Sequence, residues 1–200
     1  MLEFLDIVDE NGEPTGKTVE RKKAHAEGIR HRTSHVWLAR KRNGRVEILM
    51  QKRAENKDSY PGCYDISSAG HIPAGGGFEE SAVRELREEL GVKADEGELI
   101  YCGDRNVQWD DVFSGKPFHD NQFSRVFLLW RDVEEDQFTL QKEELESVKW
   151  IPFDECVDGI LNNKFKNCIA TDELMILKKG IEKTERMFSD ENGKYRQKDK

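Results

Sequence analysis

Apolar residues along the chain fall into short runs whose length and alternation are typical of β-strands. Asn-Gly pairs at 11–12 and 43–44 mark tight turns, because this dipeptide is the strongest short signal of a β-hairpin. The predicted strands cover residues 4–8, 35–40, 46–51, 99–102, 123–130 and the end of 143–150.

Helical periodicity is strongest in Glu79–Leu90, and Gly91 provides the left-handed residue that commonly ends a helix. Further helices are predicted at 153–161 and 172–187, and a short helix or irregular turn lies within 18–27. Strands and helices alternate without an internal repeat or an interdomain linker. This order predicts a single layered α/β domain.

Composition limits the classes of partner. Lys and Arg total 32 against 40 Asp and Glu, giving a formal charge of −8. This balance argues against a nucleic-acid polymer as partner. No apolar run approaches the roughly 20 residues that span a bilayer, and the acidic amino terminus does not resemble a signal peptide. Four scattered cysteines indicate reduced thiols, so we expect a cytoplasmic protein without a membrane partner.

The helix at 79–90 carries the most informative pattern. Glu85, Glu88 and Glu89 fall within roughly 100° on a helical wheel, apart from the apolar arc that faces the core. Neighbouring carboxylates repel one another, and Mg²⁺ removes that cost because it prefers oxygen ligands. The alternative is a solvated acidic face, with Arg84 pairing at helical spacing. The glycine-rich segment 70–77 before the helix favours a ligand site.

The segment GHIPAGGGFEESAVRELREELGV at 70–92 resembles the Nudix box, G-x5-E-x7-R-E-U-x-E-E-x-G-U, where U is a bulky aliphatic residue. The resemblance implies a Nudix-type α/β/α sandwich around a mixed β-sheet in a single domain. It covers the catalytic domain at 1–165. The apolar side of the following helix predicts that the segment 166–188 packs on this domain, and the polar tail at 189–200 is expected to be mobile. One position departs, because Gly76 stands where the family has its first glutamate.

Residue by residue, the resemblance implies a metal site for Mg²⁺ or Mn²⁺ formed by Gly70, Glu85, Glu88 and Glu89. Glu88, Glu89 and Arg84 would be the catalytic residues. The family uses the first box glutamate to brace the loop and the arginine, so Gly76 predicts a less rigid loop. Glu79 or Glu80 is the expected substitute brace for Arg84.

Substrate contacts are expected at three further positions. Lys52 and Arg53 end a strand before the glycine-rich loop and could bind phosphate oxygens, or they could be a solvent-facing basic pair. His71 is the third expected substrate contact.

Within the superfamily, the segments LDIVDENGEPTGKTVERKKAH, HRTSHVWL and SYPG…GH are most similar to the isopentenyl-diphosphate isomerase-like branch. The isomerases hold a metal with three histidines and two glutamates, and they use a cysteine and a glutamate as acid and base. The positions that match these residues here are His25, His31, His71, Asp120, Gln122 and Ala69. Ala69 replaces the essential cysteine, so isomerase activity is rejected because proton transfer to carbon needs a positioned acid.

Other candidate residues keep two interpretations. His25, His31 and His71 form either a residual metal or phosphate site or structural residues, and His35 is predicted to be structural. Trp109 lies in the predicted loop 105–121, where it either stacks on a base or anchors the loop. Glu143 and Glu144 are weak candidates for an extra catalytic acid.

Three functions follow in order of preference. The first is a metal-dependent Nudix pyrophosphohydrolase that cleaves a phosphoanhydride bond in a nucleoside diphosphate derivative or a related diphosphate. The second is a diphosphate-binding sensor with weak or no turnover, and the third is the isomerase. The expected partner is a small-molecule phosphoanhydride, and the sequence leaves open whether the protein forms a homodimer.

Overall fold

The computed structural model describes residues 2–57, 59–113 and 115–196, with the backbone alone for Lys116 and for 187–196. Its strands are β1 (Phe4–Val8), β2 (Pro14–Glu20), β3 (His31–Arg42), β4 (Arg45–Arg53), β5 (Tyr64–Asp65), β6 (Ser68–His71), β7 (Ile100–Phe113), β8 (Lys116–Trp130) and β9 (Leu145–Pro152). Its helices are α1 (Arg21–Glu27), α2 (Phe78–Leu90), α3 (Phe153–Leu161) and α4 (Thr171–Arg196), with short 3₁₀ turns η1 (Glu96–Glu98) and η2 (Glu135–Gln137).

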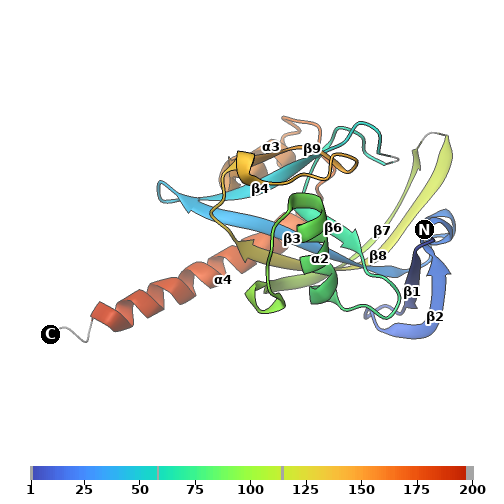
Figure 1. The fold of residues 1–200 in the computed structure, drawn as a ribbon, viewed down its shortest axis with the longest axis horizontal. Helices are drawn as coiled ribbons and strands as arrows, with labels where there is room; N and C mark the ends of the chain where they lie inside the picture. The colour runs from blue at the N-terminus through green and yellow to red at the C-terminus, as the bar shows by residue number, and fades with distance from the viewer. Residues whose placement is uncertain (1, 58, 114, 197–200) are drawn as a thin grey trace.

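Seven strands form one mixed sheet (Figure 1). The order is β5-β4-β3-β8-β7, with β6 pairing with β3 and β9 pairing with β4. Strands β3 and β8 run parallel, and the other pairs are antiparallel. Strand β4 pairs with the last residues of β3, whereas β6 pairs with its first half, so β6 begins where β4 has left β3. The separate β1–β2 hairpin packs with α1 around Leu5, Val19 and Ala24.

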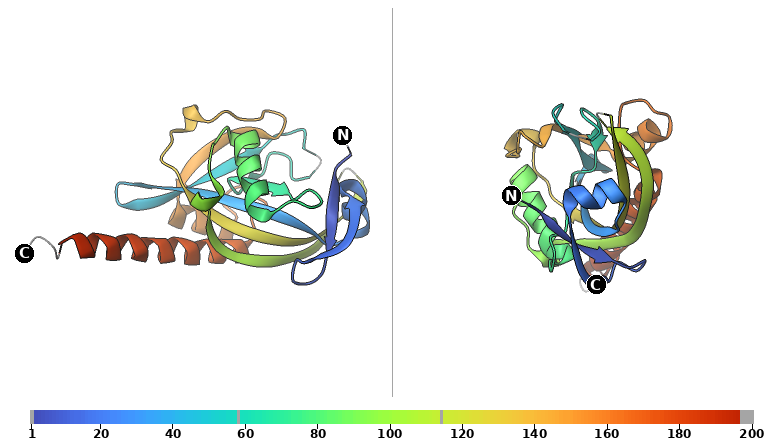
Figure 2. Two further views of the ribbon diagram at one scale, coloured as in Figure 1. Left: turned by 60° about the horizontal axis from the view of Figure 1, so that its bottom comes forward. Right: turned by 90° about the vertical axis from the view of Figure 1, so that its right-hand side faces the viewer.

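Helices cover both faces of the sheet, with α2 on one face and α3 and α4 on the other (Figure 2). Alternation along β3 explains both contacts, since successive side chains in a strand point to opposite faces. Val36 and Leu38 join the core under α2, whereas Trp37 and Ala39 join the core under α3 and α4. The expected α/β fold with a mixed sheet is therefore confirmed.

The β7–β8 hairpin corrects the sequence-based assignment. The segment 105–121, predicted to be a loop, instead continues both strands of a hairpin that pairs from Ile100 with Leu128 to Phe113 with Lys116. Polar residues predominate along it, so the segment lacks the apolar run that identified the inner ends of these strands. Part of the predicted glycine-rich loop also pairs, as β5 and β6.

Helices follow the predictions more closely. Helix α2 begins after Gly77 and ends at Gly91, whose φ of 69° is the left-handed conformation predicted for it. Segment 18–27 divides between the end of β2 and α1. Helix α4 extends from Thr171 through Arg196 and projects past the sheet (Figures 1 and 2), so it includes much of the predicted tail. The remaining tail, 197–200, lies outside the described residues.

Two further expectations concern membranes and thiols. Among the described residues, no helix combines the length and apolar character needed to cross a bilayer. The four cysteines are free thiols, in agreement with the reduced state predicted for them.

Candidate functional site

The acidic residues of α2 lie against β6. Gly70 on β6 faces Glu85 so closely that a Cβ atom on residue 70 would lie 2.2 Å from Glu85 Cδ. Any side chain at this position would therefore displace the carboxylate, which explains the need for glycine. Burial, followed by the charge of Glu88, raises the pKa of Glu85, although Arg84 opposes the shift.

Glu89 is the most deeply buried acid of the helix, with 7% of its surface exposed. Its Oε2 accepts a hydrogen bond of 2.6 Å from Ser68 Oγ, also on β6. Burial raises the pKa of Glu89 to about 8, because one hydroxyl donor does not replace the water that solvates a carboxylate. Glu85 and Glu89 thus face the same strand, and burial there disfavours the ionised form of each.

Glu88 does not share this environment. Its side chain is 47% exposed and pairs with Arg84 Nη1 at 3.1 Å. Arg84 also lies 2.7 Å from Glu85 Oε1 and donates to the His71 carbonyl at 3.2 Å. Arg84 therefore connects the acidic helix to β6, whereas the third carboxylate points toward solvent.

The prediction that Glu79 or Glu80 braces Arg84 is wrong. Glu80 accepts the Gly77 N–H at the start of α2, and Glu79 lies 3.9 Å from Arg125. Within the described part of the chain, neither of them is paired with Arg84, which is held by Glu85, Glu88 and the His71 carbonyl.

The loop around Gly76 is braced instead by one residue of β3 and one of β1. Arg32 Nη2 donates to the Gly76 carbonyl at 3.0 Å and pairs with Asp6 at 3.0 Å. Asp6 also accepts the Gly75 N–H at 2.8 Å. These contacts restrain the loop that lacks the family's glutamate, so its backbone is held at two successive residues.

The basic pair at the end of β4 is engaged in ion pairs. Lys52 lies 2.8 Å from Glu146, and Arg53 lies 3.0 Å from Asp65. Arg53 also donates to the carbonyl and hydroxyl of Ser59, so it orders the segment that follows β4. Contact with a phosphate would require these side chains to exchange partners.

Three histidines meet on the opposite face of β6. His25 from α1, His31 from β3 and His71 from β6 each offer a ring nitrogen, and these atoms lie within 4.8 Å of one another. His31 Nδ1 lies 2.8 Å from the Ile29 carbonyl, which turns its Nε2 toward the cluster. His25 Nδ1 and His31 Nε2 are buried without a hydrogen-bond partner among the described residues.

The three histidines of the cluster all have lowered pKa values, which favours their neutral form. Burial, followed by the charge of His31, lowers the pKa of His25 to about 3, and burial also lowers the pKa values of His31 and His71. Neutral imidazoles keep the lone pairs that bind a metal. The loosely matched residues lie nearby, since Asp120 Oδ1 is 3.6 Å from His25 Nδ1 and accepts from Gln122 Nε2 at 2.6 Å.

Asp120 adds a carboxylate to this cluster. Burial raises its pKa to about 6, against the effect of hydrogen bonds from Gln122 and Trp109. Ala69, the position of the isomerase cysteine, packs against the apolar core on the same face of β6 and provides no acid.

Trp109 lies in strand β7 rather than in a loop, which corrects the sequence-based placement. Its ring is 5.4 Å from that of Tyr60 and 5.8 Å from that of Phe118, and Phe118 stacks on His25 at 4.5 Å. The aromatic residues therefore connect the hairpin with the segment after β4, next to the histidine cluster. The extra acid considered earlier, Glu144, forms an ion pair with Lys57.

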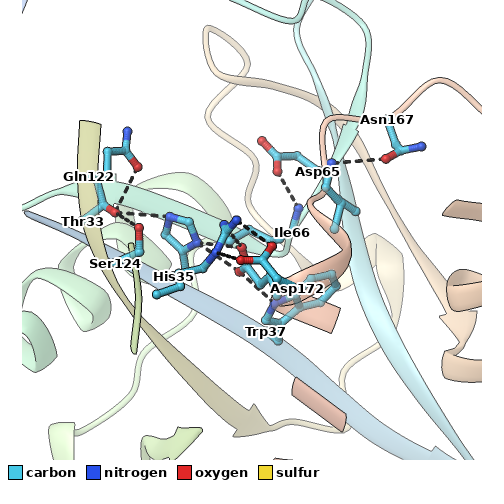
Figure 3. A network of polar contacts seen from close by, with 12 residues as sticks. Thr33, His35, Trp37, Asp65, Ile66, Gln122, Ser124, Asn167 and Asp172 are labelled. Atoms are coloured by element: carbon cyan, nitrogen blue, oxygen red, sulfur yellow. Dashed lines mark hydrogen bonds and ion pairs between the residues drawn. The ribbon is translucent and has the colours of Figure 1, made fainter. Parts of the chain in front are cut away.

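A polar network around His35 was not predicted (Figure 3). His35 Nδ1 lies 3.0 Å from Glu173 Oε1, and Glu173 also accepts from Trp37 Nε1 and Arg105 Nη1. Glu173 comes from α4, 138 residues along the chain. No sequence spacing signals a pair so far apart, although a histidine inside an apolar strand is itself a hint that it has a buried partner.

One set of candidate metal ligands thus lies on each face of β6. The oxygen donors of Gly70, Glu85 and Glu89 fit a hard cation such as Mg²⁺ or Mn²⁺, since the Glu85 carboxylate lies directly against Gly70 and Ser68 offsets only part of the cost of burying Glu89. The imidazole nitrogens suit a borderline metal such as Zn²⁺.

Comparison with known proteins identifies the family. The NUDIX domain profile matches residues 29–170. Nudix hydrolase 3 of Arabidopsis thaliana is 41% identical over 157 residues, which cover 76% of this chain but 20% of that protein. An uncharacterised Nudix hydrolase of Clostridium acetobutylicum is 36% identical over 168 residues, covering 84% of this chain and 78% of the relative.

The fold agrees with this match. The crystal structure of DR0079 from Deinococcus radiodurans superposes with a TM-score of 0.63 at 18% identity, covering 88% of this chain and 98% of that one. The profile spans more than half of the chain, and the matched residues include the acidic helix and the glycine strand described above. The chain therefore belongs to the Nudix family of hydrolases.

Proposed function

We propose that the protein is a metal-dependent pyrophosphohydrolase that cleaves a phosphoanhydride bond in a nucleoside diphosphate derivative or a related diphosphate. The observation that supports this most directly is the pair of buried carboxylates, Glu85 and Glu89, beside the glycine cradle at Gly70. Such burial is costly without a cation, and the family uses Mg²⁺ or Mn²⁺.

The residues of this chain would divide the work as follows. The Gly70 carbonyl, Glu85 and Glu89 would hold the cation, with Glu88 completing the set or accepting a proton from water. A bound divalent ion neutralises charge on the phosphate oxygens and makes a bound water more acidic. Arg84, through its hydrogen bond to the His71 carbonyl, keeps the helix in register with β6.

Substrate phosphates would be met by the basic residues at the end of β4. Arg53 is preorganised by Ser59 and Asp65, whereas Lys52 holds a single exposed partner, Glu146. Lys52 can therefore exchange its partner for a phosphate oxygen at less cost, since exposed ion pairs contribute little.

The test is a panel of nucleoside diphosphates, dinucleoside and sugar diphosphates, and prenyl diphosphates, incubated with Mg²⁺ or Mn²⁺. Product monophosphate is separated by ion-exchange chromatography. We expect turnover that Glu89→Gln abolishes and that Glu79→Gln, on the same helix but outside the acidic pair, leaves intact. Absence of turnover across the panel would refute the hydrolase. Micromolar binding by titration calorimetry without product would then favour the diphosphate sensor.

A second metal site is supported by the histidine cluster. Among the described residues, His25 Nδ1 and His31 Nε2 have no hydrogen-bond partner, and Asp120 lies beside them. The three histidines match those of the isomerases, and Asp120 supplies one of the two expected carboxylates. The visible absorption spectrum of Co²⁺ added to the protein tests this site, because nitrogen ligands give a spectrum that an all-oxygen site does not. Isomerase activity is not proposed, since Ala69 cannot transfer a proton.

A further inference from the structure

The two elements of the oxygen-donor site are joined by residues 72–77, which we call the connecting loop. Strand β6, with Gly70, lies before this loop, and α2, with Glu85 and Glu89, lies after it. A Cβ atom on residue 70 would lie 2.2 Å from Glu85 Cδ, so strand and helix are already in close contact. The path of the connecting loop therefore influences how the candidate metal ligands of the strand and of the helix are spaced.

Strand β1 lies along the connecting loop and bonds to its backbone (Figure 1). Leu5 and Pro73 form an antiparallel bridge, and the Ala74 N–H donates to the Phe4 carbonyl at 2.8 Å. Leu5 is fully buried, so the strand is anchored in the core of its own hairpin. Strand β1 nevertheless lies outside residues 29–170, the part of the chain that the NUDIX profile matches.

Asp6 adds an ionic contact to this backbone pairing. Its Oδ2 accepts the Gly75 N–H at 2.8 Å and an N–H of Arg32 Nη2 at 3.0 Å. Arg32 Nη2 also donates to the Gly76 carbonyl at 3.0 Å. The side chains of Asp6 and Arg32 are only 12% and 9% exposed. Because little water competes for these groups, the charge-assisted hydrogen bonds are stronger than the same contacts on the surface.

Arg32 depends on Asp6 for its counter-charge. Among the described residues, Asp6 is the acid that forms an ion pair with Arg32, whose side chain otherwise contacts the Gly76 carbonyl and the ring of Phe78. Arg32 Nε has no hydrogen-bond partner in the same part of the chain. Removal of Asp6 would leave a nearly buried guanidinium without its counter-ion, which is strongly unfavourable. Arg32 would then move toward water and release the Gly76 carbonyl.

The two ends of the connecting loop are held independently of Asp6. At the start, the Ile72 N–H donates to the Arg32 carbonyl at 3.1 Å, and Ile72 is 1% exposed. At the other end, Ser34 Oγ donates to the Phe78 carbonyl at 2.6 Å, in the first turn of α2. Both contacts come from β3, whereas the middle of the loop is held by β1. Loss of Asp6 is therefore expected to loosen the middle of the loop and leave its ends attached.

We propose, on the basis of the proposed function, that Asp6 is a positioning residue for hydrolysis, which acts through Gly75 and Arg32 to hold the connecting loop in the conformation that binds a divalent cation. A loop that is already ordered loses little conformational entropy when the cation binds, so its order contributes to affinity. Gly76 provides no carboxylate within the loop, and the acid is supplied by β1 instead. The amino-terminal hairpin is thereby part of the hydrolase site.

Binding of Mn²⁺ alone tests this role without turnover. Free Mn²⁺ is followed by electron paramagnetic resonance, and the binding that Glu89→Gln abolishes defines the site, because the histidine cluster also offers ligands. At this site we expect Asp6→Ala to raise the Mn²⁺ dissociation constant about tenfold. Asp6→Asn keeps an oxygen that can accept both hydrogen bonds but lacks the charge, so we expect a rise of roughly threefold.

Asp9→Ala is the matched control. Asp9 lies in the same hairpin, where its carboxylate accepts the backbone N–H groups of Asn11 and Glu13 within the β1–β2 turn. This variant should keep the Mn²⁺ affinity of the wild type. Circular dichroism and thermal melting identify variants that fail to fold. If Asp6→Ala is among them, Asp6→Asn carries the test, and wild-type affinity in Asp6→Asn then refutes the role.

Hydrogen exchange separates positioning from a general loss of structure. In Asp6→Ala the amides of Ala74 and Gly75 should exchange at least about tenfold faster. The amide of Val8, which attaches the hairpin to the Arg30 carbonyl, should keep its rate. Equal acceleration at Val8 would show that the whole hairpin opens, and would overturn the positioning role.

Steady-state kinetics connect the loop with hydrolysis. In Asp6→Ala the Mg²⁺ concentration that gives half-maximal turnover should rise about tenfold, as the Mn²⁺ dissociation constant does. At saturating metal, kcat and KM for the diphosphate should change far less, because the ligands themselves remain. A fall in kcat that saturating metal does not restore would contradict a role through cation binding.

Failure of this role and failure of the proposed function give different results. Wild-type protein without turnover on any diphosphate refutes the proposed function and, with it, a role of Asp6 in hydrolysis. Wild-type turnover with the same Mn²⁺ dissociation constant in Asp6→Ala and Asp9→Ala refutes the positioning role alone. Weaker Mn²⁺ binding confined to the Asp6 variants, in an active wild type, supports both.

Discussion

The burial of Glu89 makes protein stability depend on pH in a way that can be calculated. Its pKa is raised from an ordinary 4.5 to about 8 in the folded protein. Below pH 4.5 the Glu89 carboxyl is protonated in both the folded and the unfolded chain. Between pH 4.5 and about 8 it is protonated in the folded chain only. Stability therefore falls as pH rises through this window, and the penalty is complete above pH 8.

The magnitude follows from the size of the shift. One pKa unit corresponds to about 1.4 kcal/mol, so the buried carboxyl costs on the order of 3 kcal/mol at pH 7 in the absence of metal. Glu89→Gln removes the ionisation and can still bond to Ser68. We expect the variant to unfold at a temperature roughly 6–12 °C higher than wild type near pH 7, in a chain of this size. The two proteins should converge toward pH 5 as the penalty fades.

Thermal unfolding from pH 4.5 to 8.5 in EDTA measures this difference directly. Adding Mg²⁺ at high pH should stabilise the wild type by mass action and should stabilise Glu89→Gln far less. Glu79→Gln is the control, because its side chain is 42% exposed on the same helix. A difference between wild type and Glu89→Gln that is the same at pH 5 and pH 8 would contradict the reasoning.

Further predictions concern three other positions. Gly70→Ala should abolish Mg²⁺-dependent turnover, because the added Cβ lies 2.2 Å from Glu85 Cδ, and a turnover assay in the folded variant checks it. Gly180→Ala should lower the free energy of unfolding by about 1–3 kcal/mol in urea titrations, since its Cβ would meet Cys102 Sγ at 2.2 Å. His25→Asn should weaken Co²⁺ binding at least tenfold in spectroscopic titration while diphosphate hydrolysis with Mg²⁺ continues; unchanged Co²⁺ affinity would exclude His25 as a ligand.

Local sequence patterns predicted most of the regular structure. The turns at Gly12 and Gly44, the helix from Phe78 to Leu90 and its end at Gly91 depend on nearby residues alone, and each was predicted close to its observed bounds. The segment 105–121 was not, because a polar hairpin is stabilised by pairing between its own strands and by neighbouring elements rather than by an apolar run.

The candidate site shows the same division between short and long range. Glycine and glutamate spacing placed Glu85 and Glu89 on one side of a helix, and resemblance brought in the three histidines. Spacing could not show that Glu88 turns to solvent and pairs with Arg84. A helical wheel gives the direction of each side chain but not whether another element covers it. It also could not show that Arg32 holds the loop at Gly76.

The sequence by itself determined the family, the hydrophobic layers and the acidic helix after its glycine loop, because these depend on periodicity and on residues within one segment. The tertiary structure decided which of those acids are buried and which groups face them across β6. It alone joined His35 to Glu173, since burial and cross-strand register arise only when distant segments pack, and dehydration by packing is what changes the chemistry of a carboxylate or an imidazole.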